Sequence, residues 1–244
     1  MPPLAANSPP DVPRVSLSAG RIARALAVAI AALTAASLAG QISKYFLGHD
    51  HVFGLVALFD LDAEGNVPTW FSTVQLLACS VLLGLIGSVK HRRREPFARH
   101  WLVLSAIFLY MSADEASVIH ELLNPVIRSA LHVPPVFYYA WVVGGAVAVL
   151  VVGLVYLRFV WSLPARTRRL VIIAGSIYVA GALGMDVPEG LYAFRHGMET
   201  FPYALMTTVE EVMEMAGLTV FLYALLLYVG ASVGGIQVEV KHDG

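Results

Sequence analysis

Six long apolar segments restrict the fold of this chain more than any other feature. They cover roughly residues 23–46, 69–89, 100–123, 137–162, 169–194 and 203–232, and each has about the 20 residues that a helix needs to cross a bilayer. Because a backbone in lipid must satisfy its hydrogen bonds internally, we expect these segments to be helical. The sequence therefore predicts an all-α, polytopic membrane helix bundle with six transmembrane helices, formed by residues 21–232.

Composition supports a membrane protein. Hydrophobic residues make up 58% of the chain and charged residues 14%, whereas soluble domains carry about 25% charged residues. The formal net charge of −1 and the lack of a basic stripe with interleaved aromatics argue against a nucleic-acid partner. Cys79 is the only cysteine, so the chain has no disulfide framework and no thiolate metal site.

The distribution of basic residues predicts the orientation. Residues 90–100 (KHRRREPFARH) and 165–169 (ARTRR) are strongly basic, as is the region of Arg21 and Arg24. Basic connections face the cytoplasm, and an even number of spans then places both termini there. We expect a multi-pass protein of a bacterial inner (plasma) membrane, with a disordered N-terminal tail (1–20) and a short C-terminal tail (233–244). The first segment is alternatively a cleaved signal peptide.

Acidic residues inside the predicted spans are the main functional signal. Of 17 acidic residues, eight lie there: Asp114, Glu115, Glu121, Asp186, Glu189, Glu210, Glu211 and Glu214. Each charge at a helix centre is disfavoured by about 2.5–3.5 kcal/mol on insertion scales. Such residues normally face a bundle interior or a wet cavity and mark a functional site.

Depth and helical angle suggest that these acids meet. At a rise of about 1.5 Å per residue, Asp114 lies ~21 Å and Glu189 ~30 Å from the cytoplasmic ends of their spans, and Glu210 lies ~10 Å below the outer surface. All three therefore fall in the outer half of the bilayer. Asp114 and Glu121, seven residues apart, would share one face of an uninterrupted helix.

The acids on the last span also share a face. Glu210, Glu211 and Glu214 fit within an arc of about 100°. Glu115 and His120 are about 140° apart on their own helix, so both cannot point at one centre. One of them, Glu115 by preference, then hydrogen-bonds a neighbouring helix.

These residues predict a carboxylate and histidine site. Oxygen ligands suit a divalent metal ion such as Mg, Mn, Ca or non-haem Fe. The predicted metal ligands are Asp114, Glu121, Asp186, Glu189, Glu210, Glu211 and Glu214. His120 and Glu115 are the predicted catalytic residues, with His120 as a ligand or general base.

Two further motifs lie near this site. In GMDVPEG (184–190), Pro188 removes a backbone donor and predicts a kink beside Asp186 and Glu189. In DLDAEGN (60–66), acids at alternate positions resemble the first half of a calcium loop, but Phe71 stands where the bidentate glutamate should be. A tight turn that caps the second span is the favoured interpretation.

Three functions remain open from the sequence. The first is a metal-dependent, membrane-embedded enzyme that acts on a lipid or small amphiphile. The second is a proton- or cation-coupled transporter or channel. The third is a structural or accessory subunit, in which the acids form an interhelical network or dock a homo-oligomeric or membrane-complex partner.

Overall fold

The computed structural model describes residues 18–131 and 139–234, except for the side chains of Glu121, Leu123 and Leu131. Within these ranges the regular structure is entirely helical, as the apolar pattern predicts. The elements are α1 (Ala19–Leu47), η1 (Val52–Gly54), α2 (Leu55–Phe59), α3 (Val67–Arg92), α4 (Ala98–Ser117), α5 (Ile119–Leu131), α6 (Trp141–Ser162), α7 (Ala165–Ala182), α8 (Asp186–His196), α9 (Phe201–Tyr228) and η2 (Val229–Val233).

In the part of the chain that the structure describes, five helical stretches are long and apolar enough to cross a membrane. They are Ala19–Leu47, Val67–Arg92, Trp141–Ser162, Ala165–His196 and Phe201–Val233. The remaining predicted span corresponds to α4 and α5 and falls outside this set. In α4 the apolar run is interrupted by Arg99, Asp114 and Glu115. The apolar helices are thus compatible with a membrane protein.

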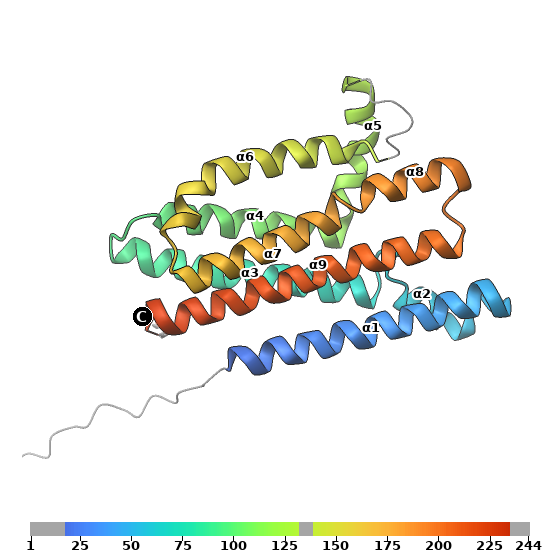
Figure 1. The fold of residues 1–244 in the computed structure, drawn as a ribbon, viewed down its shortest axis with the longest axis horizontal. Helices are drawn as coiled ribbons and strands as arrows, with labels where there is room; N and C mark the ends of the chain where they lie inside the picture. The colour runs from blue at the N-terminus through green and yellow to red at the C-terminus, as the bar shows by residue number, and fades with distance from the viewer. Residues whose placement is uncertain (1–17, 132–138, 235–244) are drawn as a thin grey trace, which may run out of the picture.

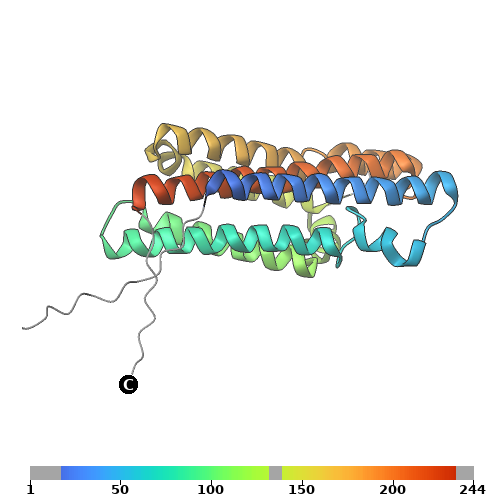
Figure 2. The same cartoon turned by 90° about the horizontal axis from the view of Figure 1, so that it is seen from below.

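The long helices run along one common direction (Figure 1). α9 is the central element and contacts α1, α3 and α7, while α3 pairs along its length with α4. Figure 2 shows α1, α7 and α9 on one side of the bundle and α3 and α4 on the other. The core between these groups contains Leu83, Trp101 and Leu225, together with the buried Cys79.

Two glycines allow α7 and α9 to approach closely. A Cβ atom at Gly217 would lie 2.9 Å from the backbone N of Tyr178 and 3.0 Å from the Ala174 carbonyl oxygen. A Cβ atom at Gly181 would lie 3.0 Å from the carbonyl oxygen of Glu210. Small residues at such crossings let membrane helices pack backbone to backbone. This contact fixes the acidic stretch of α9 against the end of α7.

Two predicted spans are interrupted where their acidic residues lie. α4 ends at Ser117, and Val118 has a left-handed conformation (φ 57°) before α5 begins. The rotation of about 100° per residue holds only within a continuous helix. It therefore does not place Asp114 and Glu121 on one face, because the break lies between them. Because a left-handed conformation is rare for a β-branched residue, the sequence gives no hint of it.

The second interruption lies between α7 and α8, at residues 183–185. Gly184 is needed there because a Cβ atom would lie 2.3 Å from the Ala180 carbonyl oxygen. The break precedes Pro188, which occupies the first turn of α8, where the missing N–H of a proline removes no helical bond. Asp186 and Glu189 consequently lie in the first turn of α8, where the helix dipole favours negative charge.

The two ends of the bundle differ in charge. The α3–α4 and α6–α7 connections, which hold the basic segments, lie at the same end as the end of α9 (Figure 1). The segment with η1 and α2 and the α8–α9 connection lie at the opposite end. The acidic residues that start α8 therefore lie toward the end away from the basic connections.

Candidate functional site

Three carboxylates from α8 and α9 form the centre of the site. Asp186, Glu189 and Glu210 each offer one oxygen, and these oxygens all lie within 4.8 Å of one another. Asp186 is 7% exposed and Glu189 only 1%. Asp186 Oδ2 and Glu189 Oε1 are buried and have no hydrogen-bond partner. Buried polar atoms are normally paired, so two orphaned oxygens in one cluster indicate a missing partner.

The electrostatics of this triad require a proton or a cation. Carboxylates this close cannot all be ionised in a poorly hydrated environment. The carboxyl groups of Glu189 and Glu210 are close enough to share a hydrogen bond, which needs a proton on one of them. None of the ion pairs among the described residues involves the triad. The buried carboxylate triad could therefore hold a metal ion.

The start of α9 fixes one wall of the site. Thr200 caps the helix, because its hydroxyl accepts a hydrogen bond from the Tyr203 backbone N–H. The Tyr203 hydroxyl hydrogen-bonds the hydroxyl of Tyr139, which interacts electrostatically with Asp186 and Glu189. A tyrosine pair thus borders the triad. This pair could not be predicted from the sequence, because Tyr139 and Tyr203 are 64 residues apart.

His120 is held by Asp114 across the break at Val118. Asp114 Oδ1 accepts the His120 backbone N–H at 2.7 Å, and Asp114 Oδ2 lies 3.2 Å from His120 Nδ1. The His120 ring also packs against Trp141 and interacts electrostatically with Asp186. A carboxylate that holds one imidazole nitrogen orients the ring toward its other neighbours. Asp114, a predicted metal ligand, directs both of its oxygens to His120.

The other predicted acids form an adjoining group. Glu214 interacts electrostatically with Glu115 and with Tyr178 of α7, and Glu211 interacts with Glu214 and Glu115. These acids lie on α4 and α9 and are not part of the triad. The side chain of Glu121 lies outside the described part of the structure. Of the predicted ligands, the geometry thus brings Asp186, Glu189 and Glu210 together most tightly.

Buried polar groups of α3 extend the site along the bundle. Gln75 donates a hydrogen bond to Thr219 Oγ1 at 2.8 Å, and its Oε1 has no partner. Ser72 Oγ and Thr73 Oγ1 are also buried without a partner. Sequence reasoning did not include these residues, although a lone glutamine in an apolar segment is a usable signal.

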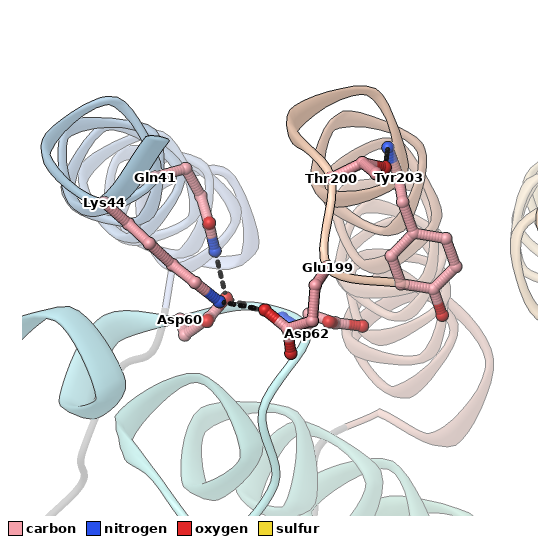
Figure 3. Close-up of polar contacts among 7 residues, drawn as sticks. All are labelled: Gln41, Lys44, Asp60, Asp62, Glu199, Thr200 and Tyr203. Carbon is pink, nitrogen blue, oxygen red and sulfur yellow. Dashed lines mark hydrogen bonds and ion pairs between the residues drawn. The ribbon is translucent and has the colours of Figure 1, made fainter. Parts of the chain in front are cut away.

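The loop that joins α1 to α3 (residues 48–66) lies at the same end of the bundle as the α8–α9 connection (Figure 1), and Figure 3 shows its polar contacts. Asp60 accepts a hydrogen bond from Gln41 Nε2 at 2.6 Å, and Lys44 of α1 pairs with Glu199 at 2.9 Å. In Figure 3, Asp62 lies between this ion pair and Tyr203. Loss of hydration among these groups raises the pKa of Asp62 to about 6, and the nearby Asp60 adds to the effect.

The same loop starts α3. Asn66 is the N-cap residue, and its Oδ1 accepts a hydrogen bond from the Thr69 backbone N–H at 3.2 Å. Gly65 has a left-handed conformation (φ 70°) immediately before it. The interpretation of DLDAEGN as a capping turn is therefore confirmed, with Asn66 as the capping side chain.

Comparison with curated proteins and with solved structures found no match. A protein-family model described as "Domain of unknown function (DUF8692)" matches residues 24–229. The match covers α2 to α9 in full and α1 from residue 24 onward, and it includes all three carboxylates of the triad. Because it covers far more than half of the 244 residues, the chain belongs to the family described as Domain of unknown function (DUF8692).

Proposed function

We propose that this protein is a membrane-embedded metalloprotein in which Asp186, Glu189 and Glu210 bind a divalent cation. The observation that carries the proposal is the pair of orphaned, buried oxygens, Asp186 Oδ2 and Glu189 Oε1, within a cluster of three carboxylates. A divalent cation would provide the missing partner for both oxygens and offset the clustered negative charge. An all-oxygen ligand set favours Mg, Mn, Ca or non-haem Fe.

The proposed topology has six spans with both termini in the cytoplasm of a bacterial inner membrane. In this arrangement α4, which pairs along its length with α3, is a span in addition to the five apolar stretches. The gathering of the basic connections at one end supports the orientation, because basic loops stay on the cytoplasmic side. The triad then lies toward the periplasmic leaflet.

The proposed chemistry is metal-assisted catalysis on a lipid or small amphiphile that enters from that leaflet. A metal ion at the triad would act as a Lewis acid or activate a water molecule. His120, oriented by Asp114 and near Asp186, is placed to move a proton. Glu115 belongs to the adjoining acidic group, so its proposed role is to tune or relay charge there.

Metal titration tests this proposal. We expect purified wild-type protein to bind Mn²⁺ in isothermal titration calorimetry, and Glu210→Gln to weaken binding strongly. Glu199→Gln is the matched control, because Glu199 is an exposed acid of the neighbouring loop, paired only with Lys44 among the described residues. Equal Mn²⁺ affinity in wild type and Glu210→Gln would contradict the metal site. Metal-dependent turnover of a bacterial lipid extract, followed by mass spectrometry, then tests the enzymatic role.

Cation or proton transport is the second candidate, and the buried polar groups of α3 favour it. Gln75, Ser72 and Thr73 provide unpartnered oxygens that continue from the acidic region into the bundle. Flux measurements in proteoliposomes separate the two functions, since only a transporter moves the ion across the bilayer. If Glu210→Gln changes neither metal binding nor flux but lowers thermal stability, the acids form a structural or partner-docking network instead.

A further inference from the structure

A second candidate site lies at the opposite, basic end of the bundle. A cavity of about 380 Å³ opens where α3 ends and α4 begins. Its lining residues are His91, Arg94, Glu95, Phe97, Ala98, Arg99 and His100. Ligand sites commonly measure about 300–1,000 Å³, so the cavity has room for a small polar group.

The charges in this cavity are predominantly positive. Its single acid, Glu95, is engaged by Lys90 at 2.5 Å and by Arg93 at 3.8 Å, two cations that do not line the cavity. The hydrogen bond from Lys90 lowers the pKa of Glu95, which therefore stays ionised and paired. No ion pair among the described residues involves Arg94 or Arg99. Two exposed guanidinium groups thus border the cavity without an acidic partner there.

Packing and backbone conformation hold part of the cavity wall in place. The His100 ring stacks on Phe159 at 5.8 Å between centroids, and the His100 carbonyl accepts a hydrogen bond from the Tyr156 hydroxyl. Arg94 and Phe97 have left-handed backbone conformations (φ 56° and 62°), which are disfavoured for residues with a Cβ atom. Such conformations persist only where the surrounding structure holds them. The loop therefore presents Arg94 and Arg99 from a constrained backbone.

We propose that this cavity binds a phosphate group, carried either by an anionic lipid headgroup or by a small soluble phosphate ester. Guanidinium groups match the geometry of phosphate oxygens and can donate two hydrogen bonds each. The cavity lies where α3 ends and α4 begins, and in the proposed six-span topology these helix ends lie at the level of the lipid headgroups. The proposal does not depend on the metal site, which is built from α8 and α9.

Binding assays with matched variants test this proposal. The probes are inorganic phosphate, glycerol 3-phosphate, and a short-chain phosphatidylglycerol in neutral detergent micelles. The reference is zwitterionic phosphatidylcholine, which has no net charge because its ammonium group offsets its phosphate. We expect Arg94→Gln and Arg99→Gln each to weaken binding about tenfold or more, as loss of a charge-assisted hydrogen bond does. Arg92→Gln is the control, because Arg92 is an exposed arginine of the same segment outside the cavity. It should weaken binding about fivefold or less, the effect of one basic charge near a surface.

The pattern across probes identifies the source of the phosphate. Binding of phosphatidylglycerol alone indicates a lipid headgroup, and comparable binding of glycerol 3-phosphate indicates a soluble ester. Thermal unfolding of each variant verifies that it is folded. If only one of Arg94→Gln and Arg99→Gln is folded, that variant alone tests the proposal. If no phosphate probe binds better than phosphatidylcholine, or if Arg92→Gln weakens binding as much as Arg94→Gln and Arg99→Gln, the proposal is wrong.

Discussion

At the scale of single residues, Glu189 has the environment that is hardest to explain by packing alone. It is 1% exposed, its Oε1 has no partner, and its nearest charged neighbours are two further carboxylates. A buried acid that served only to stabilise the fold would have its oxygens paired. Glu189 is therefore the most informative position for substitution.

Replacing Glu189 by glutamine should separate stability from metal binding. We expect Glu189→Gln to be at least as stable as wild type without metal, because one member of a crowded carboxylate cluster becomes neutral. Mn²⁺ at 100 times its Kd should raise the free energy of unfolding of the wild type by about 2.7 kcal/mol. It should leave that of the variant almost unchanged. Thermal unfolding with and without Mn²⁺ measures both effects. Equal stabilisation of the two proteins by Mn²⁺ would refute the role of Glu189 as a ligand.

Asp62 should give the protein a specific pH dependence. Its pKa of about 6 in the folded chain exceeds its ordinary value of 3.8, so the folded state holds the proton more tightly than the unfolded state. This contribution to stability is full below about pH 4 and is lost as the pH rises through about 6. Relative to wild type, Asp62→Asn should gain stability over that interval.

The pH test compares melting temperatures of variant and wild type from acidic to neutral pH. We expect a difference that grows between about pH 4 and pH 6 and then stays constant. Asp50→Asn, at an exposed acid of the same loop, controls for the loss of a surface charge. A difference between Asp62→Asn and wild type that does not change with pH would exclude the shifted pKa.

The sequence predicts which acids lie near one another, but not which side chain hydrogen-bonds which. The i, i+3 spacing of Asp186 and Glu189 predicts that they are neighbours, and their depth predicts that Glu210 is near. The role of Asp114 could not be predicted, because it depends on the helix break at Val118, which brings the His120 backbone N–H to the Asp114 carboxylate. Spacing rules assume an unbroken helix, and here the helix ends between the two residues.

At the scale of elements, the close crossing of α7 and α9 positions the acids of α9. Gly217 contacts backbone atoms of α7, which cannot move aside as a flexible side chain could. We expect Gly217→Val to destabilise the protein by about 1–3 kcal/mol or more, the usual cost of overpacking. It should also weaken Mn²⁺ binding, since Glu210 would shift away from α8.

The control for this substitution is Gly175→Val on α7. A Cβ atom at Gly175 has nothing within 4 Å, so the added side chain meets open space. Thermal unfolding and Mn²⁺ titration of the two variants check the comparison. If both variants behave alike, the close crossing does not position the site.

The element boundaries show where sequence reasoning stops. The apolar runs predict the helices because lipid admits few other backbone structures. Pro188 predicts irregular backbone in the right segment, yet the break occurs at residues 183–185 and Pro188 lies in the first turn of α8. A proline is compatible both with a kink inside one helix and with the first turn of a new helix. The tight contact of Gly184 with the preceding turn favours the second arrangement.

At the scale of the whole molecule, the proposed orientation in the membrane rests on the difference in charge between the two ends of the bundle. A membrane-impermeant maleimide should label Asp50→Cys in cells with a permeabilised outer membrane, and should label Arg92→Cys only after the inner membrane is opened. Cys79 is buried and should not react, so the wild-type chain is a suitable blank. Labelling of Arg92→Cys in cells with an intact inner membrane would reverse the orientation.

The most direct test of the account is to locate the metal ion itself. A crystal of the purified protein grown with Mn²⁺ and measured for anomalous scattering should show one peak in contact with carboxylate oxygens of Asp186, Glu189 and Glu210. Carboxylate ligands hold such hard cations at about 2.0–2.6 Å. An anomalous map with no peak at the triad, at Mn²⁺ concentrations that saturate the calorimetric signal, would contradict the central claim.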